Sequence, residues 1–136
     1  MKRFTLAILV LHIFTSVAFA QNADAVLGTW HSPHGNIVIE ITKKGTNYFG
    51  HTIAVKKTGQ ESHQSASDAG TEILKNFRYR NRGVYVGGKV FDSKSKKSSN
   101  GQMKLMGNDK LDIRIFFGII QLGRTESWTR VPIIHN

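Results

Sequence analysis

Polar and apolar residues alternate with a period of two along several short segments of the chain. Residues 36–43 place isoleucine at three alternate positions, and Glu40 and Thr42 take the opposite face. Residues 110–117 repeat the pattern with leucine, isoleucine and phenylalanine on one face. Because successive side chains of a strand point to opposite faces, the pattern predicts half-buried antiparallel strands rather than helices.

Glycine and asparagine mark turns between these segments, as at residues 44–47, 81–83 and 107–109. The expected strands, about eight in number, are 26–31, 36–43, 48–56, 73–80, 84–92, 102–106, 110–117 and 125–131. Short, evenly spaced strands without a long helical pattern predict an all-β barrel or sandwich. Gly87 and Gly88 interrupt an apolar strand and indicate a bulge that curves the sheet, which favours a closed, antiparallel, up-and-down β-barrel.

Two segments lie outside the alternating pattern. Residues 58–71 are polar and have room for one short helical turn, and residues 93–101 are expected to form a charged, flexible loop. Neither segment has the length or the apolar content of a second domain, so we expect one domain.

The first twenty residues have the pattern of a cleaved secretory signal peptide. They combine Lys2 and Arg3, an apolar run, and small residues at positions 18 and 20. A transmembrane anchor fits this segment less well because His12 interrupts the run. We therefore expect cleavage after Ala20 and a periplasmic or secreted domain of residues 21–136. The later sequence has no segment of membrane-spanning length, and the chain has no cysteine for a disulfide.

The chain is strongly basic. It has 19 lysines and arginines against nine acidic residues, for a net charge of +10, and about +8 remains without Lys2 and Arg3. A positive field of this size attracts polyanions such as lipopolysaccharide, acidic glycan or nucleic acid, without selecting among them.

The stretch GIIQLGRT, residues 118–125, differs at one position from the phosphate-binding pattern GxxxxGK[ST]. Arg124 replaces the lysine that would reach between phosphates. The following residues are rich in aromatic and β-branched side chains and end at Pro132, so they predict a strand instead of the helix that such a loop requires. We interpret the stretch as a turn into the last strand.

The first and last strands carry residues that resemble the calycin pattern of lipocalins and avidins. Gly28 and Trp30 form a Gly-x-Trp on the first strand, and Arg124, Trp128 and Arg130 lie in the C-terminal region. With further matches at Gly118, Gly123 and Thr125 and at 45–53, 70–77 and 88–92, the whole mature chain resembles the bacterial family called domain of unknown function 2147. The resemblance implies a barrel whose first-strand tryptophan closes one end beneath a C-terminal arginine.

The same resemblance implies structural roles for Trp30, Arg124, Trp128 and Arg130. A part-buried arginine contributes both its charge and its aliphatic stem to packing. Under that condition Arg124→Ala is expected to destabilise the barrel by about 1–3 kcal/mol.

Patterns that would indicate catalysis or a cofactor are not found in the sequence. His31 and His34 flank a turn, yet no cysteine and no obvious third ligand accompany them, so we expect surface residues and no metal site. The serines lack a nucleophile motif, and no pair of acidic residues has a spacing that brings two carboxylates together. The sequence therefore predicts a protein that is not an enzyme.

The leading functional hypothesis is binding of a small, partly apolar ligand inside the barrel. We expect the ligand at the barrel end away from Trp30, with Tyr48, Tyr85 and Phe91 as wall residues. Barrels of about eight strands lie at the boundary between a filled interior and an open pocket, so the sequence leaves both alternatives open.

The alternative hypothesis is an envelope interaction protein that binds polyanions on its surface. Arg78, Tyr79, Arg80 and Arg82 form a basic cluster in which a tyrosine could stack on a base or sugar while the arginines hold anionic groups. The same residues are also typical of a hairpin end whose charge keeps the protein soluble.

Overall fold

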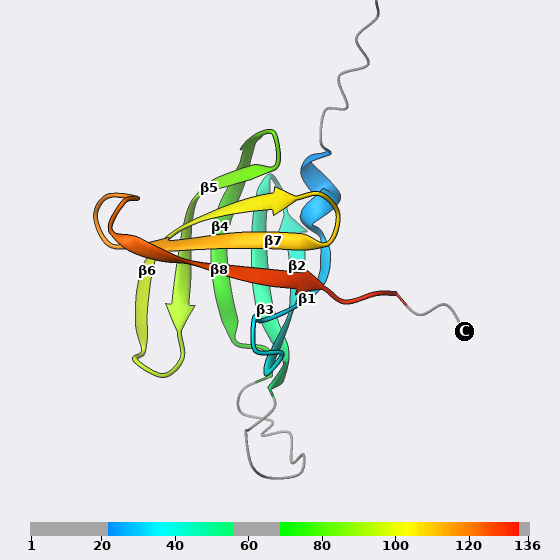
Figure 1. The fold of residues 1–136 in the computed structure, drawn as a ribbon, viewed down its shortest axis with the longest axis horizontal. Coiled ribbons are helices and arrows are strands. Elements are labelled where there is room, and N and C mark those ends of the chain that lie inside the picture. Colours follow the sequence, from blue (N-terminus) through cyan, green and yellow to red (C-terminus); the bar gives the residue numbers. More distant parts are fainter. Residues whose placement is uncertain (1–21, 56–68, 134–136) are drawn as a thin grey trace, which may run out of the picture.

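The computed structural model describes residues 22–55 and 69–133 (Figure 1). One short 3-10 helix precedes the strands. The elements are η1 (Ala23–Val26), β1 (Gly28–His31), β2 (Ile37–Lys44), β3 (Asn47–Val55), β4 (Glu72–Asn81), β5 (Val84–Asp92), β6 (Lys97–Met106), β7 (Lys110–Phe116) and β8 (Gly123–Arg130).

The eight strands form a closed antiparallel barrel in which each strand pairs with its neighbours in the sequence. The barrel closes between β1 and β8, where Trp30 pairs with Arg130 and His31 pairs with Thr129. The predicted all-β, up-and-down barrel is therefore confirmed. Closure leaves no long sheet edge exposed, and it encloses the inward-facing side chains in one interior.

Alternation along β8 places one row of side chains along the full length of that interior. Arg124, Glu126, Trp128 and Arg130 share a face, and Trp128 in the middle of the row is only 4% exposed. The apolar core around this row comes from β1, β2, β4, β6 and β7 and includes Trp30, Ile39, Phe77, Met103, Leu111 and Ile113.

The paired glycines Gly88 on β5 and Gly101 on β6 make room for the ring of Phe77. A Cβ atom on Gly88 would lie 2.4 Å from that ring, and one on Gly101 would lie 2.8 Å from it. The ladder between β5 and β6 shifts register beside Gly87, which has a φ of +76° that favours glycine. The expected bulge is therefore present, and Gly88 is required by a side chain from another strand.

Two element boundaries differ from the sequence prediction. The segment expected as a loop at 93–101 is a turn only at its start, because β6 begins at Lys97 and pairs with β5 from Asp92 onward. Its serines and lysines have a low strand propensity, but pairing with the long β5 holds them extended. Val26, expected at the start of a strand, is the buried last residue of η1.

The expected signal peptide, residues 1–20, and most of the polar segment 58–71 lie outside the described residues. Within the described parts of the chain, no helix has the length and apolar character needed to cross a membrane.

Candidate ligand-binding site

Trp30 and Arg130 close one end of the barrel beneath η1. The Trp30 indole is fully buried, and its Nε1 donates a hydrogen bond to the Val26 carbonyl at 3.0 Å. The Arg130 guanidinium carbon lies 4.2 Å from the centroid of the indole, which is a cation–π contact. Arg130 also donates to the carbonyls of Ala25, Leu27 and Asn108.

Gly28 completes this arrangement and explains the spacing of the Gly-x-Trp pair. Its φ is +128°, and a Cβ there would lie 2.9 Å from Nη1 of Arg130. Glycine is needed both for this backbone conformation and for the space that the guanidinium fills. Gly28, Trp30 and Arg130, three of the residues named by the calycin resemblance, therefore meet at one end of the barrel, with Arg130 as the arginine over Trp30.

Tyr48 and Tyr85 fasten η1 to the same closed end. The Tyr48 hydroxyl donates to Oδ1 of Asp24 at 2.6 Å, and the Tyr85 hydroxyl donates to the Ala23 carbonyl at 2.5 Å. The two rings are buried and meet edge to face with centroids 5.1 Å apart. They are not among the residues that line the open cavity, so their expected role as pocket walls is replaced by a role in closure.

The hydrogen bonds at η1 also set the ionisation of these groups. The bond from Tyr48, followed by the contact with Lys43, lowers the pKa of Asp24 below its ordinary value of 3.8. Burial raises the pKa of Tyr85 well above 10, and burial together with the Asp24 carboxylate does the same for Tyr48. Near neutral pH the tyrosines therefore donate and Asp24 accepts.

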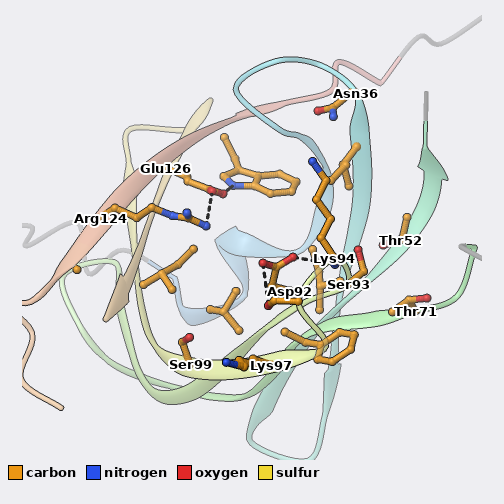
Figure 2. A pocket seen from close by; sticks show the side chains of 18 of the residues that line it. Asn36, Thr52, Thr71, Asp92, Ser93, Lys94, Lys97, Ser99, Arg124 and Glu126 are labelled. Carbon is orange, nitrogen blue, oxygen red and sulfur yellow. Dashed lines mark hydrogen bonds and ion pairs between the residues drawn. The ribbon is translucent and has the colours of Figure 1, made fainter. Parts of the chain in front are cut away.

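The other end of the barrel is open and holds a cavity of about 760 Å³ (Figure 2). Volumes of 300–1,000 Å³ are typical of small-molecule sites. Most of the wall surface is apolar, and the apolar side chains come from six of the eight strands or the segments beside them. They are Ile37, Val55, Ile73, Val90, Phe91, Ile115, Phe117 and Trp128. Phe91 is thus the one of the three predicted wall residues that lies at the cavity.

A carboxylate and a guanidinium from β8 lie on one side of this apolar wall. Glu126 accepts a hydrogen bond from Nε1 of Trp128 at 3.2 Å, and its other oxygen lies 3.3 Å from Nη2 of Arg124. Figure 2 shows the Glu126 and Arg124 side chains directed toward one another. The tryptophan therefore fixes the carboxylate, and the carboxylate orients the arginine.

The turn between β5 and β6 brings further charges to the mouth. Asp92 accepts hydrogen bonds from the backbone N–H of Lys94 and the hydroxyl of Ser95, and the first of these is the main cause of its lowered pKa. Lys94 and Lys97 line the same cavity. Its lining thus carries three cations, with Arg124 as the third, against the two carboxylates of Asp92 and Glu126.

Arg124 is 67% exposed, which corrects the expectation that it is part-buried in the fold. It lies at the cavity mouth at the opposite end of the β8 row from Arg130. Glu126 was missed in the sequence because a lone carboxylate between a tryptophan and an arginine carries no motif. Its signal was the alternation of residues 124, 126, 128 and 130, which places them on one face.

The basic cluster on β4 does not form the predicted stacking surface. Arg78, Arg80 and Arg82 are exposed, whereas Tyr79 is partly buried and packs edge-on against Tyr85 with ring centroids 5.2 Å apart. Strand alternation directs Tyr79 and the two arginines of β4, Arg78 and Arg80, to opposite faces of the sheet, and Arg82 lies in the turn that follows.

The GIIQLGRT stretch is a turn that leads into β8, as predicted. Gly118 has a φ of +72°, the strand starts at Gly123, and no helix follows. A Cβ on Gly123 would lie 2.0 Å from the Ile115 carbonyl oxygen, so glycine is required there. Thr125 receives a hydrogen bond from Arg114.

The two histidines that were expected in a surface turn differ in position and exposure. His31 ends β1 and is partly buried, and His34 is exposed in the turn. In residues 22–55 and 69–133, no three histidine, cysteine or acidic side chains gather in a way that could hold a metal ion.

An eight-stranded antiparallel barrel with one closed and one open end is lipocalin-like. Protein HP1028 from Helicobacter pylori, described as belonging to the lipocalin family, has a similar solved structure, with a TM-score of 0.63 and 13% identity over 78% of this chain and 82% of that chain. At this identity the likeness concerns the fold. Residues 28–130 match the family "Uncharacterized protein conserved in bacteria (DUF2147)", and the chain belongs to this family. A comparison with curated proteins gives no match.

Proposed function

We propose that the protein binds a small amphipathic molecule, with an apolar body and an acidic head group, in the open end of the barrel. The observation that carries the proposal is the cavity of about 760 Å³, whose wall is mostly apolar and includes the indole of Trp128. A lipocalin-like fold is compatible with this function. Burial of an apolar ligand body against these side chains would provide the main driving force.

The positions of the charged residues support an acidic head group. Lys94, Lys97 and Arg124 line the cavity and are exposed to solvent. Ile115 and Trp128 line the same cavity but are buried. Glu126 holds Arg124 at this position, and a ligand anion near Arg124 would be attracted to all three cations. The proposed ligand therefore points its apolar part inward and its acidic group outward.

The proposal includes the cellular setting expected from the sequence. The basic start and apolar run of residues 1–20 support export to the periplasm or the medium. A carrier or binding role without catalysis accords with the lipocalin-like fold, and the mass of the processed chain would test the cleavage after Ala20.

The first prediction concerns a filled cavity. Ser99 lines the cavity, whereas its neighbour Ser98 is exposed on the outer face of β6. Ser99→Phe is expected to lower the affinity for anilinonaphthalene sulfonate, an apolar anion, by roughly tenfold or more, because the new ring occupies ligand space. Ser98→Phe is the matched control and should leave the affinity unchanged.

The affinity for this probe is measured by fluorescence energy transfer from tryptophan to the bound probe. The chain has two tryptophans, and Trp128 lies at the cavity while Trp30 lies at the closed end. Transfer should therefore fall strongly in Trp128→Phe. Equal affinities for the Ser98 and Ser99 variants, with both folded by circular dichroism, would contradict binding in this cavity. In a separate experiment, native mass spectrometry of the wild-type protein from the exported fraction would identify a retained ligand.

Polyanion binding remains the second candidate, supported by the exposure of Arg78, Arg80 and Arg82 and by the net charge of about +8 that remains without Lys2 and Arg3. Because such binding releases counterions, its affinity would fall steeply with added salt. Binding of heparin that is abolished by replacing the three arginines, and unaffected by Ser99→Phe, would favour it over the cavity.

A further inference from the structure

The connection between β7 and β8 exposes a group of large apolar side chains beside the cavity mouth. Phe117, Ile119 and Leu122 are 66%, 59% and 63% exposed, and Ile120 is 37% exposed. In Figure 1 this connection projects from the end of the barrel opposite η1. Four large apolar residues exposed within six positions form a patch that normally marks an interaction site.

The backbone of this connection is tied internally, with its apolar side chains left outside. The guanidinium of Arg114 donates from Nε to the Ile120 carbonyl at 3.0 Å and from Nη2 to the Gln121 carbonyl at 3.2 Å. Two further bonds, from the Phe117 and Leu122 N–H groups to the Leu122 and Ile119 carbonyls, close the turn. Carbonyl and N–H groups that are already hydrogen-bonded to one another cost less free energy to transfer from water into an apolar medium.

Cations outnumber carboxylates at the same end of the molecule, where Asp92 and Glu126 also line the cavity. Lys94 and Lys97 line the mouth on the β5–β6 side and Arg124 lines it on the β8 side, and Lys96 is exposed in the turn between the two lysines. Phe117 lines the cavity and is also part of the apolar patch. The mouth therefore combines an apolar tip with positive charge, which is the combination that binds an anionic lipid surface.

We propose that residues 117–122 insert into the interface of an anionic lipid bilayer, so that the cavity mouth faces the lipid. The side chains of Phe117, Ile119 and Leu122 enter the boundary between head groups and acyl chains, while Lys94, Lys96 and Lys97 lie at the anionic head groups. This docking requires no ligand in the cavity and stands independently of the proposed function.

Flotation with lipid vesicles tests the docking. The wild-type chain is expected to float with vesicles of equal parts phosphatidylglycerol and phosphatidylcholine, and weakly with phosphatidylcholine alone. Ile119→Ser combined with Leu122→Ser should lower the partition coefficient on the anionic vesicles by roughly tenfold or more, because two exposed apolar side chains are lost from the inserting surface. Ile133→Ser is the matched control, since this isoleucine is 81% exposed outside the patch.

All variants must share one N-terminus, verified by mass, and a native circular dichroism spectrum. Wild-type protein that stays with the soluble fraction, or a double variant that floats as well as wild type, would overturn the proposal. If sedimentation showed a wild-type dimer, a monomeric double variant and no vesicle binding, the patch would be an interface with a second copy. Loss of probe binding with docking retained would contradict only the proposed function.

Discussion

Two arginines on the same face of β8 have different roles because they lie at opposite ends of the barrel. Arg130 stacks on Trp30 and donates to three backbone carbonyls, whereas Arg124 is largely exposed and contacts Glu126. The sequence places both arginines on the last strand and therefore predicts the same structural role for each. Only their position along the barrel separates a residue that closes the fold from one that lines the open cavity.

The residue-scale prediction follows from this contrast. Arg130→Ala is expected to lower the free energy of unfolding by about 2–4 kcal/mol, because the part-buried carbonyls of Ala25 and Leu27 lose charged donors and the indole loses its cation. Arg124→Ala should change it by about 0.5 kcal/mol or less, since Arg124 is exposed. Urea denaturation measures both. Equal losses in the two variants would contradict the assignment of roles.

At the scale of the elements, the β5 bulge and the ring of Phe77 depend on one another. Gly88→Ala places a Cβ within 2.4 Å of the Phe77 ring in the present packing. We expect a loss of about 1–3 kcal/mol in the free energy of unfolding because the core is overpacked. Phe77→Leu has a cost of its own, but it should reduce the further cost of Gly88→Ala. A double-mutant cycle by denaturation tests this, and simple additivity would contradict the contact.

At the scale of the whole molecule, the bonds that hold η1 predict how stability depends on pH. The lowered pKa of Asp24 means that its contribution is present above pH 4 and is lost as the pH falls through the folded-state value. The raised pKa values of Tyr48 and Tyr85 mean that their contribution is complete below about pH 10 and declines at higher pH.

Melting temperatures measured across pH test both the loss of stability at low pH and the loss at high pH. The difference between wild type and Asp24→Asn should be constant near neutral pH and shrink below pH 4. Tyr85→Phe should flatten the decline above pH 10, because the variant has one fewer hydroxyl that ionises only in the unfolded chain. A gap between wild type and Asp24→Asn that does not change between pH 3 and pH 7 would contradict the proposed role of Asp24.

The sequence by itself determined the strand pattern and favoured the barrel, because these depend on local alternation and on glycine positions along the chain. The closure of one end by Trp30 was expected only from the resemblance to the calycin pattern. Of the three wall residues predicted from the sequence, Phe91 lines the cavity, and Tyr48 and Tyr85 do not. Tertiary structure decided which aromatic residues close the barrel and which line the cavity. Tyr48 and Tyr85 have the same local pattern as wall residues, and only their meeting with η1, more than twenty residues away, assigns them to closure. The cavity and its Glu126–Arg124 pair likewise required eight strands to close, because their lining comes from segments far apart in the chain.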